Sequence, residues 1–246
     1  MHKHKSLNNS NGIINDELPE GEYIFLFIGS GSTDFTFAQT VYTNSTIDAW
    51  MFGYEYNNTF DTFSCRLDCE VKKGEVNSNQ VVLQRIVGKV EIILDDIIPK
   101  NVSRIIIQKK KYHYIHYNAV SDFYYWENLD ERRDDEAYDI SATDKTAAGY
   151  TISFLEFENI DENNERIPLS ITLTALREHT PDEVGFVDPY STVATKTIEN
   201  VTIEKNRTTI YRGKLFDNVN SDENIKPSAF LVSMNDEWGE DINKTF

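Results

Sequence analysis

The feature that most constrains the fold is a short-period alternation of apolar and polar residues that recurs along the 246-residue chain. Successive residues of an extended strand point to opposite faces of a sheet, so this period of two predicts half-buried strands. Between the alternating runs lie turn compositions rich in Asn, Asp, Gly, Pro and Ser. No long segment keeps the helical period, although Leu83, Ile86 and Val87 predict a single helical turn. We therefore predict an all-β protein, with strands in residues 22–28, 35–43, 80–95, 101–108, 150–157, 168–177, 195–204, 208–216 and 228–234.

The stretch NVTIEKNRTTIYRGKLF, residues 200–216, predicts a β-hairpin. Apolar and polar residues alternate before and after a break at Asn206 and Arg207. If these two residues form the turn, the register places Ile203 opposite Ile210 as an apolar cross-strand pair. No nucleophile lies beside a base in this stretch, so we interpret it as scaffold.

Charge limits the kinds of partner. Lys and Arg total 24 against 41 for Asp and Glu, which gives a formal net charge of −17. Such a field repels phosphate backbones and anionic lipid surfaces, so we predict no nucleic-acid partner. The same charge favours solubility and suits an extracellular or periplasmic protein.

The apolar runs EYIFLFI and EIILDDII are too short for a transmembrane helix, which needs about 20 apolar residues. We therefore predict no transmembrane segment. The first residues, MHKHKSLNNSNGIINDE, have basic residues but no apolar run behind them, so they do not resemble a signal peptide. Either the chain stays inside the cell, or its export signal lies upstream or was removed.

The two cysteines, Cys65 and Cys69, do not have the spacing of a zinc knuckle or a thioredoxin-like motif. Two free thiols and a short-loop disulfide are the alternatives. A flat strand would hold the two Cα atoms too far apart, so a disulfide requires a turn at residues 66–68. We favour the disulfide.

A polar stretch, KKGEVNSNQ, separates an aromatic-rich first part of the chain from a more aliphatic second part. We place a domain boundary there, with domains at residues 1–79 and 80–246. The second domain has the size and the strand candidates of one β-sandwich. The first is small for an independent sandwich.

Aromatic residues are concentrated in the segment KKKYHYIHYNAVSDFYYWENLD, residues 109–130. One interpretation is a platform that contacts glycans or proteins. The other is an edge strand protected by lysines, with its aromatic rings packed over the sandwich. The candidate contact residues are Tyr112, Tyr114, Tyr124, Tyr125 and Trp126.

No pattern predicts a catalytic, cofactor or metal site. The stretch FIGSGSTDF lacks the third glycine and the following helix of a dinucleotide loop, so we predict a turn between strands. His113 and His116 would lie on opposite faces of a strand. Asp161, Asn163 and Glu165 lack the glycine and the terminal glutamate of a calcium loop. We predict a protein that is not an enzyme and that needs no cofactor, although no spacing excludes a dispersed catalytic triad.

The charged run DERRDDEA, residues 130–137, predicts an exposed loop. A loop of this kind is open to proteases. Arg132 and Arg133 would then be accessible to a trypsin-like enzyme.

Several segments, taken in order, resemble the fimbrillin and FimB-type fimbrial anchor proteins of type V pili. The pattern L-x-R-x-x-x-K-V-E begins at Leu83, and N-V-x-I-x-x-N-R-x-T begins at Asn200 and is followed by Gly213. The pattern L-P-x-G-x-Y begins at Leu18, and Trp238 closes the last segment. The wider resemblance covers VVLQRIVGKVEIILDDIIPKNVSRIIIQ, GYTISFLEF, IPLSITLTA, TKTIENVTIEKNRTTIYRGKLF and AFLVSMNDEW.

The resemblance implies two transthyretin-like β-sandwiches, export as a lipoprotein to the outer membrane, and a structural role in a surface fimbria that adheres to other cells. Subunits of such fibres are thought to join when a strand of one pairs with an open groove of another. The resemblance carries over no catalytic residues to this chain. The rival hypothesis is a glycan-binding surface β-sandwich.

The chain departs from that family at its start. Members have a lipobox cysteine and several strands before the L-P-x-G-x-Y segment, whereas only 17 residues precede Leu18 here. Either the start is truncated, or the first sandwich is incomplete and a partner fills its groove.

Overall fold

β-Strands account for nearly all of the regular secondary structure, as the alternating sequence predicts. The structure is a computed structural model of the chain, and the residues that it describes are 13–30, 36–38, 51–53, 61–111, 114–118, 123–127, 132–160, 165–179, 189–216 and 231–235. Within these ranges the single helical element is a 3-10 turn, η1 (Thr143–Lys145). The prediction of an all-β fold is confirmed. No helix of the described residues is long and apolar enough to cross a membrane.

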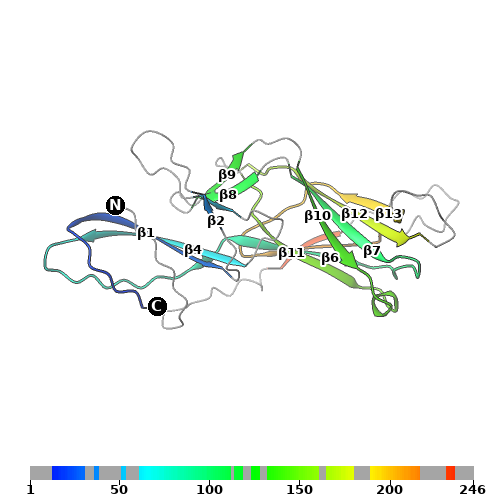
Figure 1. Cartoon of the computed structure of the whole chain (residues 1–246), viewed down its shortest axis with the longest axis horizontal. Helices are drawn as coiled ribbons and strands as arrows, with labels where there is room; N and C mark the ends of the chain where they lie inside the picture. The colour runs from blue at the N-terminus through cyan, green and yellow to red at the C-terminus, as the bar shows by residue number, and fades with distance from the viewer. Residues whose placement is uncertain are drawn as a thin grey trace.

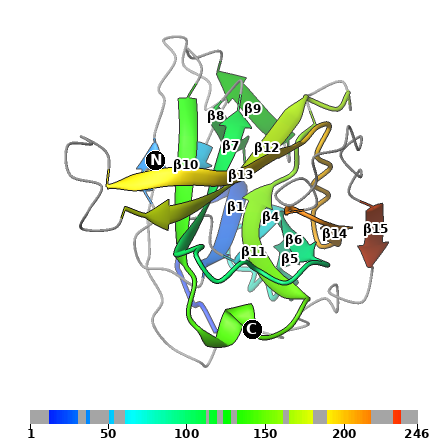
Figure 2. The same ribbon diagram turned by 90° about the vertical axis from the view of Figure 1, so that its right-hand side faces the viewer.

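Two four-stranded sheets pack face to face in the C-terminal part of the chain (Figures 1 and 2). The first sheet has the order β10 (Arg132–Asp139), β7 (Arg104–Lys111), β12 (Leu169–Glu178), β13 (Tyr190–Ile198). The second has the order β11 (Tyr150–Phe157), β6 (Val87–Leu94), β14 (Thr208–Gly213), β15 (Leu231–Asn235). Neighbours in these sheets are antiparallel except β14 and β6, which run parallel.

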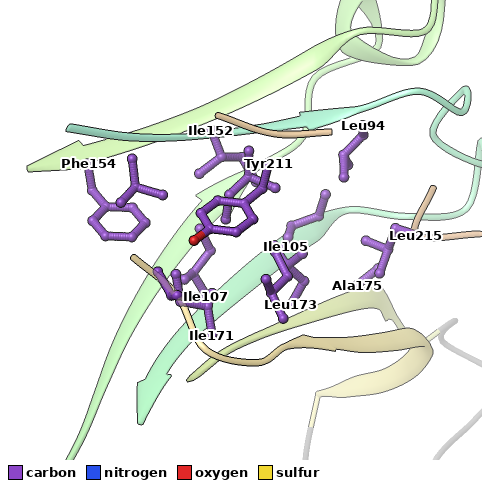
Figure 3. Close-up of a cluster of buried hydrophobic side chains, with 14 of the residues drawn as sticks. Leu94, Ile105, Ile107, Ile152, Phe154, Ile171, Leu173, Ala175, Tyr211 and Leu215 are labelled. Carbon is purple, nitrogen blue, oxygen red and sulfur yellow. The ribbon is translucent and has the colours of Figure 1, made fainter. Parts of the chain in front are cut away.

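Inward-facing side chains of the two sheets form the hydrophobic core. Ile105 and Ile107 of β7 and Leu173 of β12 are fully buried, and they face the second sheet. Figure 3 shows these side chains pointing toward Ile152 and Tyr211 of the opposite sheet. The alternation in these strands therefore has the meaning predicted from the sequence: the apolar residues are inside the sandwich.

The N-terminal part forms a long antiparallel ribbon that extends away from the sandwich (Figure 1). Strands β1 (Gly21–Ser30) and β4 (Thr62–Val71) pair over ten residues each, from Gly21 opposite Val71 to Ser30 opposite Thr62. At the end nearest the sandwich, β4 also pairs with the two-residue strand β5 (Gln84–Arg85).

A further sheet combines short strands from distant parts of the sequence. Its order is β2 (Thr36–Ala38), β3 (Met51–Gly53), β8 (Tyr114–Asn118), β9 (Phe123–Glu127). This sheet and the β1–β4–β5 sheet both contain strands from either side of the boundary between residues 79 and 80. The division into two domains stays a prediction.

The predicted hairpin in residues 200–216 is wrong. A turn does occur at Asn206, which has φ 60°, but residues 201–207 form no strand, and β14 pairs with β6 and β15 instead. Val201 and Ile203 are nevertheless fully buried. Apolar and polar residues alternate here because this segment inserts into the core without joining a sheet. Groups from other parts of the chain form the hydrogen bonds of its backbone.

Two other local predictions are wrong. The residues expected to form a helical turn lie in extended chain, because the chain passes from one sheet to another at Ile86, whose N–H donates to the carbonyl of Thr62 at 3.0 Å. The charged run at residues 130–137, expected to be a loop, contributes most of strand β10, which pairs with β7. Its inward positions hold polar residues, so the hydrophobic period is missing there.

Candidate functional site

Strand β1 is a long sheet edge with little protection against pairing with another chain. In the part of the chain that the structure describes, β1 has a strand neighbour, β4, on one side. Its sequence GEYIFLFIGS contains one charged residue, Glu22, and no proline. Proteins usually protect sheet edges with charges, prolines or bulges, and the edge strand β10, RRDDEAYD, follows that rule. A long, nearly uncharged edge such as β1 favours strand addition.

One face of β1 carries a row of aromatic side chains. The rings of Tyr23 and Phe25 lie 6.3 Å apart between centroids, and those of Phe25 and Phe27 lie 6.4 Å apart. All three are half-buried, as is Leu67, the partner of Phe25 on β4. The hydroxyl of Tyr23 donates to the carbonyl of Pro19 at 2.8 Å, which fixes the chain at the start of the ribbon.

The opposite face of β1 is also apolar. Ile24 is 51% exposed, and Leu26 and Ile28 are half-buried. Across on β4, the guanidinium of Arg66 donates to the carboxylate of Asp68 from Nη2 at 2.8 Å. A two-stranded ribbon with apolar side chains on both faces is marginally stable alone, since such strands usually need a third strand or a packed layer.

The segment after the ribbon returns along the face of Phe27 and Cys65. A Cβ placed on Gly29 would contact Leu83 at 3.2 Å, and the amide of Asn79 lies 3.9 Å from the sulfur of Cys69. Asn77 donates to the carbonyl of Glu70 at 2.9 Å. This segment therefore partly covers one face of the ribbon.

The favoured disulfide is wrong. Cys65 and Cys69 are free thiols in one uninterrupted strand, and no turn occurs at residues 66–68. Four residues of strand span about 13 Å, well beyond the roughly 7 Å limit for a disulfide. Burial raises the pKa of the Cys65 thiol, while the backbone N–H of Val82 partly opposes this rise.

Arg85 joins the ribbon to the sandwich. Its guanidinium holds Asp61 through Nε at 2.7 Å and Nη2 at 3.1 Å, and it lies 4.8 Å from the centroid of the Phe63 ring. Its Nη1 donates to Oδ1 of Asn206 at 3.1 Å. A planar, forked cation suits this combination of a carboxylate, an amide and a ring.

The two most specific motifs of the resemblance contact each other at this joint. The backbone N–H of Asn206 donates to the carbonyl of Val87 at 2.9 Å, and the backbone N–H of Lys89 donates to the carbonyl of Arg207 at 2.9 Å. Any Cβ at Gly88 would clash with the carbonyl oxygen of Glu204. Both motifs are therefore structural, and Gly88 is present because the two backbones approach closely.

The aromatic candidates of residues 109–130 lie in or beside a hairpin of β8 and β9. Tyr114 pairs in register with Glu127, and Tyr125 with His116. Alternate positions belong to opposite faces of a sheet, so Tyr124 and Trp126 share one face and Tyr125 belongs to the other. Tyr112 lies outside the described residues. A contact role for these residues stays a prediction.

The described residues contain no group of three or more His, Cys, Asp or Glu side chains that could hold a metal ion. Of the residues considered for metal binding, His116 lies in β8 and Glu165 is described. His113, Asp161 and Asn163 lie outside the described residues, as do Trp238 and residues 31–35 of the FIGSGSTDF stretch.

Comparison with known proteins places the chain among fimbrial proteins. Residues 2–183 match the family of fimbrillin-A associated anchor proteins Mfa1 and Mfa2. No curated protein matches the chain.

The chain also matches two solved structures. A proposed cell adhesion protein from Bacteroides ovatus is 11% identical, with a TM-score of 0.42 over 92% of this chain and 72% of that one. Another from Bacteroides eggerthii is 11% identical, with a TM-score of 0.36 over 72% of this chain and 63% of that one. Because the family match spans well over half of the chain, this protein belongs to the fimbrillin-A associated anchor proteins, a family of structural fimbrial components.

Proposed function

We propose that this protein is an anchor or accessory subunit of a bacterial surface fimbria and that it binds a neighbouring subunit by strand addition along β1. The observation that carries this proposal is the combination of a long, nearly uncharged edge with apolar side chains on both faces of the same strand. Family membership supplies the class of partner, a fimbrial subunit.

The occupant that fits β1 is an extended segment with apolar residues at alternate positions. Its main-chain groups would pair with those of β1, and its apolar side chains would extend the surfaces formed by Phe25 and by Leu26. Ten residues of strand extend about 33 Å, so a donor of similar length would add a full-length strand beside the β1–β4 ribbon. Such pairing needs no catalytic group, and we propose no enzymatic activity.

Cell-surface localisation follows from the same proposal. A subunit that anchors a fimbria acts outside the cytoplasm, and the acidic net charge of −17 is compatible with an exposed life. We propose attachment at the outer membrane as a lipoprotein and a part in cell adhesion, in line with the family.

Co-purification with fimbrial subunits encoded in the same genome tests this function. The tagged protein is expected to retain one of these subunits, and Ile24→Lys is expected to lower retention at least tenfold by placing a charge on the β1 surface. Ile97→Lys is the matched control, since Ile97 is 57% exposed but lies outside the ribbon. Equal retention by both variants would contradict the assignment to β1, and no retained subunit would contradict the fimbrial role.

A further inference from the structure

A lysine side chain occupies the end of the sandwich core. Lys109 follows Ile105 and Ile107 at the inward positions of β7, and its side chain is 1% exposed. Lysine is almost never buried to this extent unless it is paired, because removing an ammonium from water is costly. The groups around this amine therefore decide its chemistry.

Three groups from two strands surround the amine of Lys109, and a fourth, Tyr138, is bonded to one of them. Its Nζ lies 2.7 Å from Oε1 of Glu136 on β10 and 3.6 Å from Oε2 of Glu156 on β11. It also lies 4.8 Å from the centroid of the Phe154 ring. The hydroxyl of Tyr138 donates to the other oxygen of Glu136, Oε2, at 2.7 Å. An amine, a carboxyl group, a second carboxyl group and a phenol thus meet in one cluster.

The cluster is nearly dry. The side chain of Glu156 is 3% exposed and that of Glu136 is 18% exposed. A buried ion pair loses the hydration of both charges, and its attraction often fails to compensate for that loss. Condensation of the amine with a carboxyl group would remove both charges and leave a neutral amide that needs far less hydration.

We propose that Lys109 and Glu136 join through an isopeptide bond between Nζ and Cδ, with the Glu156 carboxylate moving the proton. Transfer of a proton from the ammonium to Glu136 gives a neutral amine and a carboxylic acid. The lone pair of Nζ then attacks Cδ of Glu136. The Tyr138 hydroxyl, already bonded to Oε2, stabilises the negative charge that forms on that oxygen.

The remaining steps need no oxidant, metal or co-reactant. Glu156 accepts one proton from the attacking nitrogen and delivers it to Oε1, which leaves as water when the C–O bond breaks. One N–C bond forms, one C–O bond breaks, and one water molecule is released. Burial and the hydrogen bond to Glu136 raise the pKa of the Tyr138 phenol, which keeps it protonated as a donor.

The bond would fasten an edge strand to the middle of its sheet. Strand β10 has β7 as its strand neighbour among the described residues, and residues 109 and 136 enclose the β8–β9 hairpin. A covalent link between them would close residues 109–136 into a loop and would restrict the unfolded chain. In a fibre subunit under tension, this link would keep β10 paired with β7.

Intact mass spectrometry of the purified full chain, denatured after folding, tests this proposal. The expected mass is one water molecule below the sequence mass, and a protease digest should contain the Lys109 peptide joined to the Glu136 peptide. Lys109→Arg keeps the cation but cannot condense in this way, and Glu156→Gln removes the proton carrier. Both variants should have their full sequence masses.

An internal control is the pair of Lys89 and Glu91, whose Nζ and Oε1 lie 2.6 Å apart but whose side chains are 28% and 24% exposed. Their peptides should remain unlinked. A full sequence mass for the unmodified chain would overturn the proposal, and so would a water loss that maps to other residues. A link that survives in Glu156→Gln would overturn the role of Glu156.

Discussion

Arg85 donates a hydrogen bond from Nη1 to Oδ1 of Asn206 at 3.1 Å across 121 residues of sequence. The same guanidinium holds Asp61 at the base of the ribbon. The Arg85 side chain, which is only 10% exposed, therefore helps to attach the proposed docking strand to the sandwich. This link connects the rigidity of the sandwich to the position of β1.

Arg85→Met should loosen the ribbon while the sandwich stays folded. Hydrogen bonds to charged groups contribute about 1.5–3 kcal/mol each, so amide exchange in β1 and β4 should accelerate roughly tenfold or more. Arg66→Met is the matched control, because its ion pair with Asp68 is exposed and should matter little. Exchange measured by mass spectrometry that is equal in the two variants would contradict this role of Arg85.

Gly88→Ala should destabilise the sandwich. A Cβ at this position would lie 2.7 Å from Cγ2 of Ile203 and would clash with the backbone of Glu204. Overpacking of this kind costs about 1–3 kcal/mol, which chemical denaturation can measure. Gly29→Ala is the control, since its Cβ would lie 3.2 Å from the end of the flexible Leu83 side chain and at an ordinary contact distance, 4.0 Å, from Cβ of Phe63. Equal effects of the two variants would argue against close backbone packing at Gly88.

Asn159→Ala should lower the free energy of unfolding by about 3–5 kcal/mol, because three backbone groups, two buried and one partly buried, would lose their partner. The Asn159 amide donates to the carbonyls of Ile167 and Val201, both at 2.8 Å, and its oxygen accepts from the N–H of Ile203 at 2.8 Å. Asn77→Ala removes one exposed hydrogen bond and should cost well under 1 kcal/mol. A small loss for Asn159→Ala would show that water replaces the amide.

These contacts explain which parts of the fold the sequence could predict. Where both sheets supply apolar partners, as for Ile152 in β11, the alternation predicts the strand and its buried face. The segment around Ile203 alternates in the same way, but Asn159 and the Tyr211 hydroxyl, which bonds Thr202 N–H at 2.7 Å, satisfy its backbone. Side-chain partners of this kind come from distant positions, and periodicity does not reveal them.

In strand β10 the reverse occurs: a strand is present where the sequence pattern predicts none. Its inward residue Glu136 bonds Lys109, and Tyr138 bonds Glu136, so a period-two search finds no purely apolar face. The candidate docking strand can be predicted in part from the sequence, since the run EYIFLFI predicts a strand. That β1 is an edge depends on the sheet order, which no local pattern specifies.

The Cys65 thiol should titrate at a higher pH in the folded chain than in the unfolded chain, because burial raises its pKa. A raised pKa means that the folded state binds this proton more tightly. Its contribution to stability is therefore present below the unfolded-state pKa and is lost as pH rises through the folded-state pKa. Alkylation rates of a Cys69→Ser variant, measured against pH with and without urea, check this shift. Coincident profiles would contradict burial of the thiol.

Thermal unfolding with donor peptides tests the proposed strand addition most directly. The peptides copy extended, alternating segments of fimbrial subunits from the same genome, and amide exchange of β1 is measured in parallel. We predict that one peptide raises the midpoint for the unmodified chain and for Ile97→Lys, protects β1 from exchange, and does neither for Ile24→Lys. A midpoint that rises equally for Ile24→Lys, or a rise without protection of β1, would contradict strand addition at this edge.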